Sequence, residues 1–198
     1  MSDLLDLTAT ARELARLVRG TRDDQLDDPT PCPAYTVADL LDHVQGLTIA
    51  FTRAATKEPM TGDAAPSGDA SRLPADFRDR IAAGLDLLAA AWAEPSAHEG
   101  RTTAGPVEMA APEAALVALD EITVHAWDLA AATGQRYGAD PAAVAACTGF
   151  VASFVPPVGG VADDDGPGLF GPPVAVADDA SPLDRLLGLT GRDPGWRG

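Results

Sequence analysis

The sequence predicts an all-α fold, with a helical body over about residues 1–154 and an irregular tail over about residues 155–198. Three observations support this prediction. Apolar residues recur at helical spacing in four long segments. Aromatic residues make up only 5% of the chain and alanine is abundant, which favours closely packed helices. The prolines and glycines gather between these segments and in the tail. We expect one domain over residues 1–198, because a tail with so few apolar groups could not fold alone.

The first helix is predicted over Asp3–Arg19, where the apolar residues share one face and Gly20 follows as a stop. The stretch Asp23–Tyr35 is expected to be a stiff, non-helical connection because of its three prolines, Pro29, Pro31 and Pro33. Thr36 then serves as a helix N-cap, and Asp39 completes a capping box three residues later. The second helix is therefore predicted from residue 36 to about residue 56.

A third helix is predicted over Asp76–Ala93, after a loop at residues 58–74 that is rich in Gly, Pro, Ser and Asp. Trp92 should lie in the core. The composition gives strands little support in the chain as a whole, and His98, in the polar link that follows, is interpreted as a surface loop residue. The fourth helix is expected over Glu113–Thr133, before Gly134.

Two shorter helices complete the predicted elements. One spans Pro141–Phe154, and the other, Leu183–Leu189, is the helical part of the tail. We expect the tail to wrap the helical body, with Leu169, Phe170 and Trp196 as its anchors.

The candidate functional residues lie on the second and fourth helices. Apolar residues surround segment 113–132 on most of its circumference, as in a helix buried on nearly every side. Glu121, His125 and Asp128 share one narrow stripe there. A buried carboxylate needs a partner, and the i, i+4 spacing makes His125 the neighbour of Glu121. His43 lies at the rim of the apolar face of the second helix, so its imidazole can reach a neighbouring helix. These three residues could hold one metal ion, with Asp128 as an outer hydrogen-bond acceptor.

Simpler interpretations remain open at each position. A Glu–His pair four residues apart is often an ordinary side-chain contact. Asp128 is equally compatible with a hydrogen bond between helices. Cys32 precedes a helix N-terminus, where the dipole favours a thiolate, and is a weaker candidate for a catalytic thiol. Catalytic residues therefore stay unassigned.

Charge and composition narrow the expected partners to small molecules. The chain has 14 basic and 30 acidic residues and a net charge of −16, which repels nucleic acid and anionic membranes. No window approaches the roughly 18 apolar residues of a membrane span, and the start lacks the basic flank of a secretion signal. We expect a cytoplasmic location and no disulfide framework from two cysteines. The oligomeric state stays open, a homodimer included.

Three motifs resemble one known family: Thr-Pro-Cys-Pro at 30–33, Val-Ala-Asp-Leu-Leu-Asp-His at 37–43 and Glu-Ile-Thr-Val-His-Ala-Trp-Asp-Leu-Ala at 121–130. They are similar to the metal-binding domain of mycothiol-dependent maleylpyruvate isomerases, within the DinB-like superfamily. Ala-Thr-Gly-Gln at 132–135, Gly-Leu-Phe-Gly-Pro-Pro-Val at 168–174 and Asp-Arg-Leu-Leu at 184–187 resemble a single-domain branch of that family. The resemblance covers nearly the whole chain.

The resemblance implies an antiparallel four-helix bundle with a divalent metal held by His43, Glu121 and His125. The metal is typically zinc, with nickel or iron as alternatives. A low-molecular-weight thiol such as mycothiol would be the cosubstrate. Full-length isomerases carry a further C-terminal domain for substrate, which this sequence is too short to contain, so maleylpyruvate isomerisation is not assigned. Arg185 and Arg192 are candidate anion-binding groups, although exposed surface arginines are the simpler interpretation.

Three protein ligands leave a coordination position free, as in catalytic zinc sites. The first hypothesis is a metal-dependent thiol transferase or isomerase, in which the thiol loses its proton and attacks an electrophilic carbon. One alternative is a metal-dependent hydrolase, in which water replaces the thiol. Another is a non-catalytic protein that binds metal or a small molecule.

Overall fold

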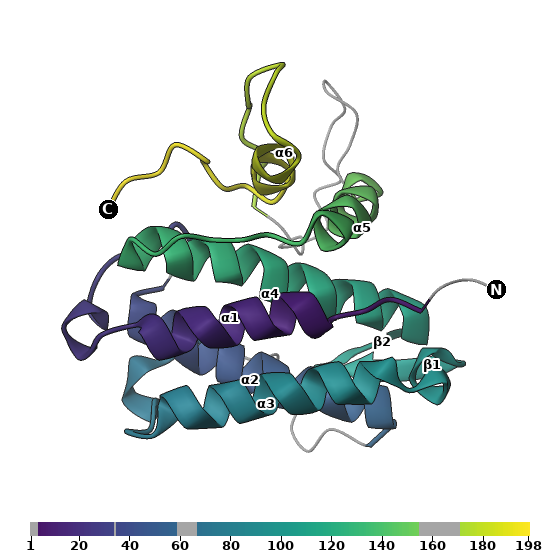
Figure 1. Cartoon of the computed structure of the whole chain (residues 1–198). Coiled ribbons are helices and arrows are strands. Elements are labelled where there is room, and N and C mark those ends of the chain that lie inside the picture. Colours follow the sequence, from purple (N-terminus) through teal and green to yellow (C-terminus); the bar gives the residue numbers. More distant parts are fainter. Residues whose placement is uncertain (1–3, 34, 59–66, 155–170) are drawn as a thin grey trace.

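The computed structural model describes residues 4–33, 35–58, 67–154 and 171–198. This part of the chain is mostly helical, as predicted, and also contains a small two-stranded sheet (Figure 1). Its helices are α1 (Thr8–Gly20), α2 (Val37–Thr56), α3 (Phe77–Ala93), α4 (Ala111–Thr133), α5 (Pro141–Ala152) and α6 (Pro182–Leu189). Short 3-10 helices occur at Asp23–Gln25, Ala70–Arg72 and Pro95–His98. None of the described helices is both long enough and apolar enough to cross a bilayer.

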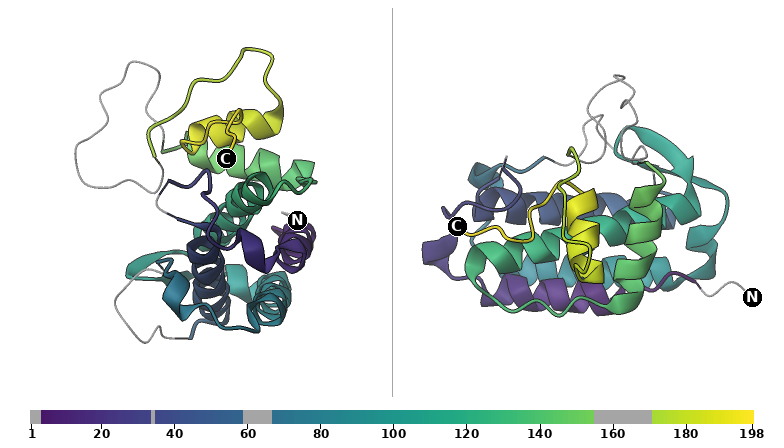
Figure 2. Two further views of the ribbon diagram at one scale, coloured as in Figure 1. Left: turned by 90° about the vertical axis from the view of Figure 1, so that its left-hand side faces the viewer. Right: turned by 90° about the horizontal axis from the view of Figure 1, so that it is seen from above.

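Helices α1 to α4 lie side by side around a shared core (Figure 2). Both α1 and α2 pack against α3 and α4. Arg78 at the start of α3 donates to the carbonyl of Thr21 just after α1, so these two helices are antiparallel. The ends of α2 and α3 meet where Lys57 donates to the carbonyl of Ala97, so this pair is parallel. The largest fully buried side chains include Leu14, Leu17, Leu40, Leu41, Ile81, Leu85, Leu88, Trp92, Leu119 and Leu129.

The helix ends follow the capping residues seen in the sequence. Thr36 Oγ1 accepts from the backbone N of Asp39 at 3.3 Å, and Asp39 Oδ2 accepts from the backbone N of Thr36 at 3.0 Å. This reciprocal capping box starts α2 as predicted. Gly134 ends α4 with φ 66, a left-handed conformation that suits glycine. The start of α1 is later than predicted, at Thr8, and Asp6 Oδ1 just before the helix accepts from the backbone N of Thr8 at 2.8 Å.

The link between α3 and α4 contains a β-hairpin, although the composition gave strands little support. Strand β1 (Arg101–Ala104) pairs antiparallel with β2 (Val107–Ala110). Gly105, with φ 58, occupies the tight turn in a conformation that glycine adopts at little cost. Thr102 Oγ1 donates to the carbonyl of Ala54 at 2.6 Å and ties the hairpin to the end of α2.

His98 is not the surface loop residue that the sequence predicted. It belongs to the 3-10 helix Pro95–His98 and is partly buried. Its Nε2 lies 2.8 Å from the carbonyl O of Trp92, and the imidazole meets the indole with 5.5 Å between ring centroids. The ring therefore packs against the end of α3, while Trp92 itself is fully buried as expected.

Helices α5 and α6 form a further layer over α4 (Figures 1 and 2). Leu186 and Leu187 are the fully buried anchors of the tail. Of the predicted anchors, Leu169 and Phe170 lie outside the described residues and Trp196 is partly buried. The tail thus packs through its helix α6 against α5, which in turn packs against α4.

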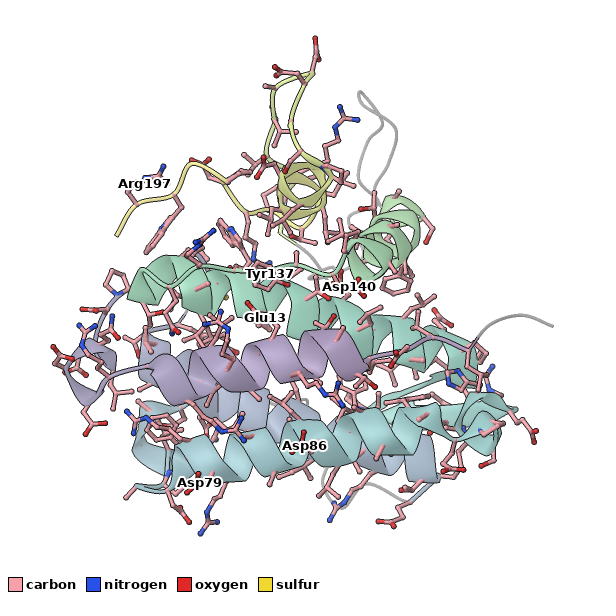
Figure 3. All side chains as sticks on the ribbon, viewed as in Figure 1. Glu13, Asp79, Asp86, Tyr137, Asp140 and Arg197 are labelled. Carbon is pink, nitrogen blue, oxygen red and sulfur yellow. The ribbon has the colours of Figure 1, made fainter. Side chains whose placement is uncertain are left out.

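The connection from α4 to α5 is tied to the helical body. Tyr137 and Glu13 are close to each other where this connection passes α1 (Figure 3). Glu13 Oε1 accepts from the backbone N of Gly138 at 2.9 Å, and Tyr137 donates its hydroxyl to the carbonyl of Thr123 at 3.0 Å. These bonds fix the position of α5 on α4.

Candidate metal centre

Helices α2 and α4 bring the three predicted ligands together. One donor atom each from His43, Glu121 and His125 lies within 4.8 Å of the other two. Glu121 Oε2 is 3.2 Å from His125 Nε2 and 3.7 Å from His43 Nε2. The two imidazole rings meet edge to face, with centroids 4.9 Å apart. Helical spacing placed Glu121 and His125 on one stripe of α4, and the structure brings His43 of α2 next to them.

The carboxylate and the imidazoles stabilise one another's charges. Removal from water would raise the pKa of Glu121, but the nearby imidazoles of His125 and His43 outweigh this effect and hold the pKa well below its usual range. Burial would lower the pKa of His125, but its bonds to Asp128 and Glu121 raise that pKa to about 9. The cluster therefore already places a negative oxygen where a cation would be held.

The donor set suits a borderline divalent metal. Two imidazole nitrogens and one carboxylate oxygen are ligands for zinc, and also for nickel or iron(II). The side chains of His43 and His125 are only 11% and 7% exposed, whereas Glu121 is 29% exposed. A further ligand could therefore approach from the carboxylate side.

Asp128 fixes the orientation of the His125 ring. Its Oδ2 lies 2.9 Å from His125 Nδ1, so Nε2 is the nitrogen that faces Glu121. The Asp128 side chain is fully buried, and a buried carboxylate needs such partners. An outer hydrogen-bond acceptor behind His125 would make this contact, and that role for Asp128 stays a prediction.

The comparisons with known proteins place these residues in a family. Residues 7–130 match the family described as Mycothiol maleylpyruvate isomerase N-terminal domain. The chain belongs to this family. Two uncharacterized proteins from strains of Mycobacterium tuberculosis are each 34% identical over 129 residues, which is 64% of this chain. The matched part spans 65% of the length of each relative. No solved structure matches the chain.

In this family member, a second partner of Asp128 comes from the tail. Arg192 Nη2 donates to Asp128 Oδ2 at 3.1 Å, and Arg192 Nε lies 3.5 Å from Oδ1. The Arg192 side chain is only 15% exposed, so its interpretation as an exposed arginine was wrong. Arg185 is exposed and donates to the carbonyls of Ala180 and Asp178. The alternative for Asp128 was a hydrogen bond between helices, but the partners described for it are His125 on the same helix and Arg192, which follows the end of α6.

The proline-rich connection covers the α2 side of the cluster. The Tyr35 ring lies 5.3 Å from the His43 ring, centroid to centroid. Thr30 Oγ1 donates to the carbonyls of Cys32 and Tyr35, which folds this segment back on itself. Cys32 is partly buried and lies within electrostatic reach of Arg192. A catalytic role for Cys32 remains a prediction.

Sequence reasoning missed Asp120, the neighbour of Glu121 on α4. Its side chain is 4% exposed, and among the described residues its Oδ1 has no hydrogen-bond partner. Burial, reinforced by the negative charge of Glu121, raises the pKa of Asp120 to about 7. Its position in the apolar surroundings of segment 113–132 was the signal that could have identified it as a buried carboxyl group.

Proposed function

We propose that this protein binds one divalent metal ion and uses a low-molecular-weight thiol, such as mycothiol, in a transfer or isomerisation reaction on an electrophilic substrate. The observation that carries the proposal is the convergence of His43, Glu121 and His125 within 4.8 Å, in a chain whose residues 7–130 match the family. Zinc is the first candidate metal, with nickel or iron as alternatives. Nucleic acid and membranes are not proposed as partners, given the net charge of −16.

We also propose that α1 to α4 are the four-helix bundle expected of the family, although the family's antiparallel arrangement applies to α1 and α3 and not to α2 and α3, which are parallel. The support is their packing, in which α1 and α2 each contact both α3 and α4. Such a bundle holds ligands on facing helices at fixed separation. In this arrangement α2 supplies His43, and α4 supplies Glu121 and His125.

The residues of the chain have distinct roles in this proposal. His43, Glu121 and His125 hold the cation, and Asp128 keeps His125 Nε2 directed at it by accepting from Nδ1. When bound, the cation would act as a Lewis acid and lower the pKa of a thiol beside it, so that the thiol is deprotonated at neutral pH. The partial exposure of Glu121 leaves the approach for thiol and electrophile on the carboxylate side.

Metal content tests the site directly. We expect elemental analysis of the purified protein to find about one equivalent of metal, and close to none in Glu121→Ala or in the double variant His43→Ala/His125→Ala. Glu113→Ala, on the same helix but outside the cluster, is the matched control and should keep its metal. A wild-type protein that stays metal-free after reconstitution would overturn the proposal.

Product analysis tests the reaction. With metal bound, we expect turnover of electrophiles to require mycothiol and to give thiol adducts or isomerised products. Products that contain water in place of thiol would favour a hydrolase instead. Metal binding without any turnover would favour a binding protein. Full thiol-transfer activity in metal-free Glu121→Ala would contradict the proposed mechanism.

A further inference from the structure

The tail beyond the matched region reaches the back of the candidate metal centre. The family match ends at residue 130, whereas Arg192 lies in the tail and contacts Asp128 on α4. Asp128 in turn contacts His125 Nδ1 at 2.9 Å. A line of three charged side chains therefore runs from the tail to a candidate ligand.

The local structure of the tail determines where Arg192 points. Helix α6 begins with a capping box at Ser181 and ends with the backbone N of Arg192 donating to the carbonyl of Leu187 at 2.8 Å. The backbone N of Gly191 donates to the carbonyl of Gly188 at 3.2 Å, which completes a Schellman motif. Gly191 has φ 80, a left-handed conformation that favours glycine. The chain reversal at Gly191 turns Arg192 back toward α4.

The guanidinium of Arg192 is held at several points. Its Nη2 donates to Asp128 Oδ2 at 3.1 Å and its Nη1 donates to the carbonyl of Thr190 at 2.9 Å. Its charge also lies within reach of Glu121. Because its donors are directed at Asp128 and at the tail backbone, this arginine is placed to orient a carboxylate of the protein.

We propose that Arg192 is a positioning residue for the metal centre, holding Asp128 in the conformation that directs His125 Nε2 at the cation. This inference rests on the proposed metal binding and deepens it, because it makes the tail a part of the site. Asp128 is fully buried, so without Arg192 its carboxylate loses one of the two partners that the described residues give it and becomes free to rotate or to draw in water. The His125 ring then loses its fixed orientation.

The first test uses the metal-free protein. The chain has only three histidines, so NMR of their side-chain nitrogens and protons can be assigned with His125→Gln and His98→Gln variants. In the wild type we expect a slowly exchanging His125 Nδ1 proton, held by Asp128. In Arg192→Gln this signal should broaden or disappear. Arg185→Gln removes a charge from the same tail without touching Asp128 and should leave the signal unchanged.

The second test measures the metal centre itself. We expect Arg192→Gln to weaken Co²⁺ affinity about tenfold, the lower end of the effect of losing an outer partner, and to alter the visible absorption of bound Co²⁺. Arg192→Lys can still donate one hydrogen bond to Asp128, so it should recover part of the Co²⁺ affinity and part of the wild-type absorption. This variant keeps the test valid if Arg192→Gln folds poorly. Arg185→Gln should match the wild type.

The outcomes separate this inference from the proposed function. An unchanged His125 signal and unchanged Co²⁺ affinity in folded Arg192→Gln would reduce Arg192 to an anchor of the tail and overturn the inference. If the wild-type protein binds no metal, the proposed function fails, and the inference about a metal centre fails with it. Loss of the His125 signal in Arg192→Gln would then show only that Arg192 orients the ring.

Discussion

At the residue scale, the two nitrogens of His125 face different partners. Nδ1 meets the buried Asp128 at 2.9 Å, and Nε2 meets the partly exposed Glu121 at 3.2 Å. The His125 ring thus lies between Asp128, which is buried and contacts the tail, and Glu121, which faces the solvent-accessible side of the cluster. Any change that removes the contact of Nδ1 with Asp128 would also change the direction of Nε2, because the imidazole ring is rigid.

The two cysteines should differ sharply in reactivity. Cys147 is fully buried, and burial raises the pKa of its thiol, whereas Cys32 is partly exposed. We expect a thiol reagent at pH 8 to modify Cys32 in the folded protein and to reach Cys147 only after denaturation. Mass spectrometry of the labelled chain identifies the site. Cys147→Ser should label like the wild type, and rapid native labelling of Cys147 would contradict its burial.

Residue patterns predicted the candidate ligands but not all of the residues that hold these ligands in place. Helical spacing placed Glu121, His125 and Asp128 on one stripe, because neighbours on a helix face follow from the 3.6-residue repeat. The same repeat carries no information about which residues meet across 64 positions of sequence. The contact of Arg192 with Asp128 therefore could not be predicted, and Arg192 was interpreted as a surface residue.

At the element scale, long helices were predictable and the hairpin was not. The boundaries of α2 and α4 lie close to the predicted ones, because long apolar repeats and caps determine them. Strands β1 and β2 have four residues each; β1 is polar apart from Ala104, and the single Val-Glu-Met alternation in β2 is too short to predict a strand. Tertiary contacts, such as that of Thr102 with Ala54, help to hold the hairpin in place.

A pair of helix glycines tests how closely α2 and α3 approach. A Cβ at Gly84 of α3 would lie 2.6 Å from Thr48 Oγ1 of α2, whereas no described residue lies within 4 Å of a Cβ at Gly149 of α5. Overpacking costs about 1–3 kcal/mol and exceeds the helix-propensity gain of about 1 kcal/mol. We expect Gly84→Ala to lower the free energy of unfolding by about 1 kcal/mol and Gly149→Ala to raise it by about 0.5–1 kcal/mol.

Urea unfolding measures both changes, and Thr48→Ala combined with Gly84→Ala should relieve most of the loss. Equal effects of the two alanine substitutions would show that α2 and α3 can separate at little cost.

At the scale of the whole molecule, α4 is shared by two layers. On one side it packs with α1 and α2, and on the other it carries α5, on which α6 rests. This one helix carries the candidate ligands Glu121 and His125, and also Asp128, which the tail contacts through Arg192. Metal binding and docking of the tail should therefore be coupled, and the coupling must be reciprocal.

Metal removal tests this coupling. At a metal concentration about 100 times the dissociation constant, binding adds about 2.7 kcal/mol to stability, which raises the melting temperature of a chain of this size by about 5–10 °C. Chelation should reverse this gain and also increase hydrogen exchange at amides 186–192, at the end of α6 and just after it, with a smaller change in α3. In Arg192→Gln the response of amides 186–192 to metal should be lost. If the metal changes exchange only in α2 and α4, the tail is energetically independent of the site.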